Sequence, residues 1–261
     1  MIRILDVQWA GTTNMEKERI LLTVGCSHAA GNEIDGEGES HYNRTHNFGA
    51  KLAERLRRRS INKALGGLCN QGIARTAMRF VDRYWDRETQ DLMVLVCWTE
   101  NSRMEIPVMQ AQMQYYPEGT EDYKMHTNNM YYQMNMGWPG GTEEEKEFLG
   151  DYQRFMATNL KFLETLSAMQ VIMLQNLFKA ENIPYLMCNT MEMFTPGPHL
   201  SNYLSMIDPK NYYNAFDNTR SFYWYYRNKG YENANAEYWH HDETPHELYA
   251  QELYSFYRSQ Q

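Results

Sequence analysis

The chain has 261 residues, a net charge of −8 and four cysteines, Cys26, Cys69, Cys97 and Cys188. Binding to a phosphate backbone needs clustered Lys and Arg, so this acidic balance argues against a general nucleic-acid surface. The scattered cysteines lack CxxC spacing, which favours reduced thiols over a disulfide framework. No apolar stretch approaches the length of a membrane span, and the N-terminus has no signal-peptide h-region. We therefore expect a soluble protein with no membrane partner, long enough to bury a full core.

Predicted strands and helices alternate along the chain. The apolar run 20–24 predicts a buried strand that ends at Gly25, and 91–98 is the clearest buried strand. This alternation predicts an α/β fold in one domain, residues 1–261, with a parallel sheet covered on both faces. The other expected elements are strands at 2–9, 60–65 and 183–188, and helices at 46–59, 70–87, 142–180 (broken near Thr165) and from Thr244 onward.

Three stretches do not belong to this alternation. Residues 32–40 are rich in Gly and Glu and predict an exposed loop. An insertion at about 107–141 is rich in Met and Tyr. A second insertion, at about 202–231, is rich in aromatic residues. Long insertions of this kind are typically lids or binding loops, and aromatic faces with polar edges suit sugar rings or a protein partner. The alternative is that the aromatic side chains pack the insertions onto the body of the domain.

Polar residues follow the predicted strands, at the sheet edge where α/β proteins normally bind ligands. Ser27 comes after the strand predicted at 20–24, among small residues, either in an ordinary turn or with its hydroxyl facing a cleft. Gly66-Gly67 follows the next strand, and its backbone N–H groups could stabilise an oxyanion. Residues 97–103 add polar groups at the end of the clearest strand. Residues 237–246 are dense in carboxylates and imidazoles, so they can supply the base and orienting acid that a serine nucleophile needs.

These four stretches, in this order, resemble the sequence blocks of the SGNH/GDSL hydrolases, particularly phage-type members. Gly25-Cys26-Ser27-His28 resembles the nucleophile block Gly-Asp-Ser, with Cys in place of Asp. Residues 62–75 resemble the second block, and 98–103 resemble the third, although its usual oxyanion asparagine is not cleanly placed. Glu237-x-x-His240 has the spacing of the last block, Asp-x-x-His-Pro, with Glu for Asp and His241 for Pro.

The resemblance implies a three-layer α/β/α sandwich with a mostly parallel sheet, the flavodoxin-like fold of these hydrolases. It also implies a catalytic triad. Ser27 is the expected nucleophile, His240 the base and Glu237 the acid that holds the imidazole. The departures from the last block leave His241 as a rival base and Asp242 as a rival acid.

The resemblance also implies oxyanion donors at the ends of the strands predicted at 20–24, 60–65 and 91–98. They are the backbone N–H groups of Ser27 and Gly67 and the side-chain amide of Asn101, with Thr99 as a rival to Asn101. No cofactor is expected. The tail histidines lack both His-Glu-x-x-His and paired-cysteine spacing, so no metal is expected either.

The predicted activity is that of a serine ester hydrolase acting on a small-molecule or carbohydrate ester. The substrates usual for the family that the chain resembles, together with the aromatic stretches, favour O-acetyl groups of a carbohydrate as the ester that is cleaved. The alternative is a hydrolase scaffold that has lost activity and serves as a binding or structural protein, for instance on a phage particle. In that case the aromatic insertions are partner surfaces. The expected location is the host cytoplasm or the virion, where association into a homo-oligomer is a further prediction.

Overall fold

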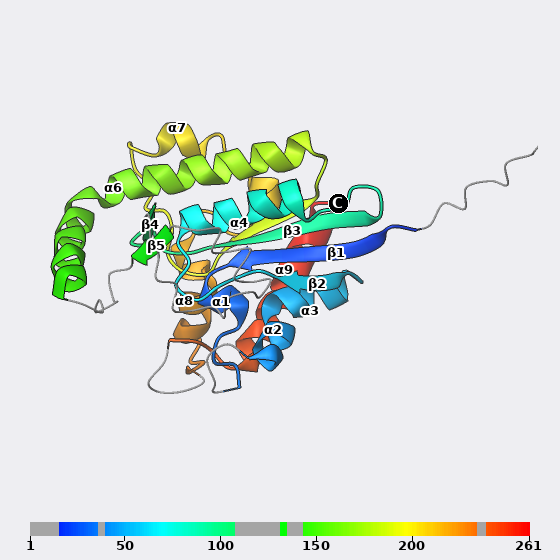
Figure 1. Cartoon of the computed structure of the whole chain (residues 1–261). Helices are drawn as coiled ribbons and strands as arrows, with labels where there is room; N and C mark the ends of the chain where they lie inside the picture. Colours follow the sequence, from blue (N-terminus) through cyan, green and yellow to red (C-terminus); the bar gives the residue numbers. More distant parts are fainter. Residues whose placement is uncertain (1–15, 36–39, 108–130, 135–142, 234–238) are drawn as a thin grey trace, which may run out of the picture.

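The computed structural model describes residues 16–35, 40–107, 131–134, 143–233 and 239–261. At its centre is a four-stranded parallel sheet in the order β2-β1-β3-β6 (Figure 1). β1 (Glu18–Gly25) pairs with β2 (Arg59–Asn62) on one side and with β3 (Gln90–Trp98) on the other. β6 (Tyr185–Asn189) pairs with the far side of β3. Up to its fourth strand, this is the order of a flavodoxin-like doubly wound sheet.

Helices cover both faces of the sheet, which confirms the predicted α/β/α sandwich (Figure 1). On one face lie α4 (Asn70–Arg83) and α6 (Glu143–Ala180). On the other lie α3 (Phe48–Arg55) and α9 (Glu243–Ser259). The shorter elements are α1 (Ser27–Ala30), α2 (His41–His46), β4 (Met104–Pro107), β5 (Tyr131–Met134), α7 (Ser201–Leu204), η1 (Pro209–Asn211), η2 (Asn218–Arg220) and α8 (Phe222–Asn228).

The residues of β1 alternate between two hydrophobic cores. Ile20 and Leu22 are fully buried in the core beneath α4 and α6, whereas Leu21 is fully buried in the core beneath α3 and α9. A central parallel strand is covered on both faces, so its side chains are mostly apolar; in this run the exception is Thr23, which is also fully buried. This two-sided burial explains the largely apolar run from which the strand was predicted.

α6 departs from its predicted course. It continues through Thr165, where a break was expected; the Thr165 hydroxyl donates to the Lys161 carbonyl one turn earlier (2.9 Å) without interrupting the helix. The helix kinks at Asn159 instead, where the backbone is non-helical (φ −126°, ψ 19°). The Asn159 side chain donates to the Phe155 carbonyl at 2.8 Å, a local bond that competes with the helical pattern. The predicted break is therefore wrong by about two turns.

The loop after α1 also differs from its prediction. Residues 32–40 were expected to be exposed, yet Ile34 is 8% exposed and the Glu33 side chain only 12%. Gly31 ends α1 in the left-handed conformation (φ 81°), and a Cβ there would come within 2.9 Å of the Ile34 side chain. The start of the loop is therefore packed against the body, while residues 36–39 lie outside the described part.

The aromatic stretch 202–231 folds into short helical turns that pack against the sheet layers. Tyr212, Phe222, Tyr223 and Tyr226 are all buried in it. Its aromatic side chains thus serve mainly as core. Of the stretch 107–141, the structure describes only its first residue and β5, which pairs with β4 in an antiparallel hairpin. The strand expected at 2–9 lies outside the described residues.

The cysteines take no part in disulfide bonds. All four are buried and free. Within the described ranges, no helix is both long and apolar enough to cross a membrane.

Candidate active site

The strand order reverses at β1. The chain runs from β1 to β2 on one side and then returns past β1 to β3 on the other. At such a switch point the carboxyl ends of two adjacent strands open a crevice, where ligands normally bind. Gly25 of β1 lies opposite Cys97 of β3, so Ser27 and Thr99 follow strand ends that lie side by side. The predicted nucleophile is thus at the edge where a ligand is expected.

Ser27 is the first residue of α1, directly after the β1 turn. Gly25 permits this turn, because a Cβ there would come within 2.6 Å of the Ala29 Cβ and 2.8 Å of the Cys97 Cβ. Ser27 is 7% exposed, and no described residue forms a hydrogen bond with its hydroxyl. Its backbone N–H donates to no carbonyl of the described chain, as expected at a helix start. Both groups remain available to a bound molecule.

His240 reaches this edge from the C-terminal loop. Its ring centroid lies 4.7 Å from that of His28, the residue after Ser27. Nδ1 of His240 lies 2.7 Å from Oε2 of Glu33, and the two side chains are only 15% and 12% exposed. A carboxylate can only accept a hydrogen bond, so Nδ1 carries the hydrogen, and in the matching neutral tautomer Nε2 is the acceptor. No described residue bonds to that Nε2. A base held by a buried acid in this way can accept a proton from a nucleophile.

Glu33 was not among the candidates found in the sequence. Its backbone is left-handed (φ 69°), an uncommon conformation for a residue other than glycine. Together with Gly31 it forms a tight turn from which its carboxylate contacts His240. Strained residues of this kind tend to occur at functional sites. The sequence offered one clue, an acidic residue close behind the nucleophile block. Glu237, the acid predicted instead, lies outside the described residues.

The rival base and acid hold the C-terminal loop in place. His241 is fully buried, with Nε2 3.0 Å from the Tyr223 carbonyl oxygen and Nδ1 3.2 Å from that of Glu232. Burial lowers the pKa of its imidazole. Asp242 caps α9 by accepting the Thr244 N–H at 3.0 Å. Both rivals therefore have structural partners, whereas His240 keeps a free ring nitrogen.

Two further imidazoles lie buried beside the site. Burial, followed by the charge of His240, holds the pKa of His28 well below its usual value. Burial likewise depresses the pKa of His246, whose Nδ1 accepts the Phe48 N–H at 3.2 Å. The His246 ring also stacks on the Phe48 ring, 5.5 Å between centroids. Both imidazoles are neutral parts of the core beneath this sheet edge.

Gly67 presents an open backbone donor after β2. Its φ of 73° is left-handed, which explains why glycine occupies this position, and no atom lies within 4 Å of the place where a Cβ would be. Its N–H donates to no carbonyl of the described residues. The N–H groups of Gly67 and Ser27 therefore meet the first requirement for oxyanion donors.

The side-chain amide of Asn101 is already engaged. It donates to the Met193 carbonyl, and its oxygen accepts a hydrogen bond from the Asn70 side-chain amide at 3.3 Å. One Asn101 N–H remains for a ligand. Thr99 is fully buried, and its hydroxyl has no partner among the described residues. Asn70, missed as a functional residue, accepts the Thr99 N–H (2.9 Å) and donates to Ser167 of α6 (3.0 Å), which fixes this loop.

An exposed tryptophan precedes the candidate base. Trp239 is 64% exposed, and its ring lies 5.9 Å from the ring of Tyr223. The Tyr223 ring lies in turn 5.4 Å from that of His28. An accessible indole next to His240 offers a flat apolar face to a bound molecule.

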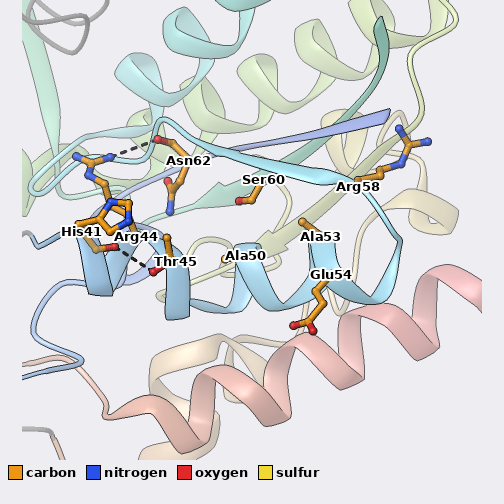
Figure 2. Close-up of a pocket in the computed structure, with 9 residues that line it drawn as sticks. All are labelled: His41, Arg44, Thr45, Ala50, Ala53, Glu54, Arg58, Ser60 and Asn62. Atoms are coloured by element: carbon orange, nitrogen blue, oxygen red, sulfur yellow. Dashed lines mark hydrogen bonds between the residues drawn. The ribbon is translucent and has the colours of Figure 1, made fainter. Parts of the chain in front are cut away.

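A pocket of about 500 Å³ lies between β2 and the helices α2 and α3 (Figure 2). Neither Ser27 nor His240 lines it. Of its two arginines, Arg58 is bound to the Asp91 carboxylate at 3.0 Å and Arg44 donates to the Asn62 carbonyl at 3.3 Å, so both have structural partners. The pocket holds no counterpart of the Ser27 and His240 arrangement. In the part of the chain that the structure describes, no group of three His, Cys, Asp or Glu side chains could hold a metal ion.

Comparison with known proteins adds one distant structural likeness. No protein-family model matches the chain, and no curated protein matches it. Among solved structures, a carbohydrate esterase whose active site "displays divergent catalytic and non-catalytic binding functions" matches with a TM-score of 0.44 and 10% identity. The match covers 94% of this chain and 66% of that protein, so this chain spans less than two thirds of its length. A likeness this distant assigns neither a family nor an activity.

Proposed function

We propose that the protein is a serine hydrolase that cleaves carboxylic esters, with O-acetylated carbohydrates as its substrates. The observation that carries the proposal is the buried contact between His240 and Glu33 at the strand edge of Ser27. This contact fixes the tautomer of His240 and leaves its Nε2 free. The hydroxyl of Ser27, on the neighbouring turn, has no hydrogen-bond partner among the described residues. The resemblance of the sequence blocks to the SGNH/GDSL hydrolases gives the same nucleophile and base.

The first half of the reaction forms an acyl-enzyme. The Ser27 Oγ attacks the carbonyl carbon of the ester while Nε2 of His240 takes the hydroxyl proton. The negative charge that develops on the carbonyl oxygen is stabilised by the N–H groups of Ser27 and Gly67, each donor contributing roughly 3–4 kcal/mol. Glu33 stabilises the imidazolium that forms. Collapse of the intermediate breaks the bond to the alcohol oxygen, which leaves with the proton from His240.

The second half releases the acid. A water molecule gives its proton to His240 and attacks the acyl carbon bound to Ser27. The same two N–H groups stabilise the second oxyanion. When that intermediate collapses, Ser27 Oγ leaves and recovers its proton from His240. The carboxylic acid departs, and the free enzyme is restored.

Trp239 supports a carbohydrate as the alcohol part of the ester. Its exposed indole adjoins His240, on which the leaving alcohol depends for its proton. An aromatic ring offers an apolar face with a preferred stacking geometry, which fits the flat C–H face of a sugar ring.

The test is labelling with a fluorescent fluorophosphonate, which reacts with activated serines. We expect the parent protein to be labelled, Ser27→Ala to show no labelling and His240→Ala to be labelled slowly. His241→Asn serves as the matched histidine variant; it loosens the loop but leaves His240 in place, so it is expected to be labelled faster than His240→Ala. An unlabelled parent would contradict the proposal and favour the inactive binding scaffold. Labelling that depends on His241 rather than His240 would move the base by one residue.

A further inference from the structure

We propose that Arg103 forms a subsite for a carboxylate on the substrate, so that the preferred esters are those of acidic carbohydrates. The inference rests on the proposed esterase function for the reaction, but the binding it describes can be measured without catalysis. It is carried by the position of Arg103, its burial and its incomplete hydrogen bonding.

Arg103 belongs to the same sheet edge as Ser27. It lies five residues past the end of β3, the strand that pairs with β1. The positive charge of Arg103 helps to lower the pKa of His28, although burial and His240 contribute more. Burial disfavours the charged form of Arg103 itself, whereas Cys26 and Glu100 favour it. Cys26 and His28 are the residues on either side of Ser27. The guanidinium is therefore within electrostatic reach of both neighbours of the nucleophile.

The guanidinium is buried but has an unused donor. The Arg103 side chain is 13% exposed, and its Nε donates to Oε1 of Glu100 at 2.8 Å. Its Nη1 is buried and has no hydrogen-bond partner among the described residues. An unpartnered buried donor is unfavourable, and in native proteins such a group usually has a functional partner, an ion or a water molecule. A bound ligand that supplies an acceptor would complete the hydrogen bonding of Arg103.

A carboxylate is the ligand that this donor fits. The planar fork of a guanidinium matches the two oxygens of a carboxylate, and the resulting bonds are charge-assisted. The protein as a whole carries a charge of −8, so an anionic substrate needs a local cation at the site. Glu100 neutralises only part of that cation, because it accepts from Nε and is itself 34% exposed. The N–H groups of Ser27 and Gly67 already account for the oxyanion, so Arg103 is left for a second anionic group.

The first experiment compares O-acetylated glucuronate with O-acetylated glucose as substrates. We expect the parent to prefer the acidic ester by about 10- to 100-fold in kcat/KM, the range of one charge-assisted bond. Arg103→Gln should bring the ratio close to one, mainly through a higher KM for the acidic ester. Arg103→Lys, which keeps the charge but not the fork, should give an intermediate ratio. Arg59→Gln is the matched control. Arg59 is the first residue of β2, at the sheet edge opposite to that of Ser27, and pairs with Glu18. This variant should keep the parent ratio.

The second experiment measures binding without turnover. Ligand-observed NMR compares glucuronate with glucose on Ser27→Ala and on the double variant Ser27→Ala/Arg103→Gln. Binding of glucuronate that disappears with Arg103 supports the subsite even if no ester is hydrolysed, in which case only the proposed function fails. Equal loss of kcat/KM for both esters in Arg103→Gln would overturn the inference. The inference would also be overturned if free acetate inhibited the parent but not Arg103→Gln while the parent showed no preference for acidic esters. Arg103 would then bind the released acid rather than a carboxylate of the sugar.

Discussion

Glu33→Gln is the substitution that separates the observed acid from the one predicted by spacing. The 2.7 Å contact to His240 joins side chains that are 12% and 15% exposed, so water replaces little of what is lost. A hydrogen bond to a charged group is worth about 1.5–3 kcal/mol, which corresponds to a rate loss of about 10- to 150-fold. The glutamine amide can also donate to Nδ1, which moves the ring proton to Nε2 and removes the base. We therefore expect a loss of at least about 100-fold in kcat.

The assay is kcat for an activated acetyl ester, measured beside two controls. Glu33→Asn removes the carboxylate but suits the left-handed turn, so it should be as inactive as Glu33→Gln while unfolding at a similar temperature. Glu237→Gln removes the acid predicted from the sequence and should remain close to the parent. The reasoning is refuted if Glu237→Gln loses activity while Glu33→Gln keeps it.

Three other predictions concern stability and substrate binding. His28 and His246 are kept neutral by depressed pKa values and take up protons on unfolding, so the free energy of unfolding should fall as pH drops below about 6.5. The slope should reach roughly 1.4 kcal/mol per pH unit for each imidazole in urea titrations, and a pH-independent midpoint would contradict it. Asn70→Ala strands the buried Thr99 N–H and should lower the free energy of unfolding by about 2–4 kcal/mol in the same titrations; a loss below 1 kcal/mol would contradict this. Trp239→Ala should raise KM for acetylated sugars but not for a small activated ester, and equal effects on both would remove the stacking role.

The layers of the fold could be predicted from the sequence because burial leaves a local pattern. The apolar runs of β1 and β3 reflect strands covered on both faces, and both were located to within a few residues. The bend of α6 could not be located, since Asn159 and Thr165 are both able to bond to a carbonyl one turn earlier. Only the three-dimensional structure shows which of the two leaves the helical conformation.

The candidate site was predictable where it depends on strand ends, and less so where it depends on turns. Ser27 follows β1 by two residues and Gly67 follows β2 by five, so their place at the sheet edge could be inferred. Glu33 contacts His240 across more than two hundred residues through a left-handed turn, which no spacing rule describes. Arg103 was part of a block but had no role, because its unused donor depends on burial.

Of the rival acid and the rival base in the C-terminal loop, the role of one could be predicted from the sequence and the role of the other could not. Asp242 precedes Glu243 and Pro245 at the start of a predicted helix, so its capping role could have been read from the sequence. His240 and His241 are adjacent and chemically identical, and only the structure shows that His241 lies between two backbone carbonyls.

Trapping the acyl-enzyme tests the central claim most directly. The parent protein is quenched during turnover of an activated acetyl ester, and the adduct is located by mass spectrometry of its peptides. The account predicts one acetyl group on Ser27, and neither adduct nor turnover in Ser27→Ala. Turnover that continues in Ser27→Ala, or an adduct on another residue, would contradict it.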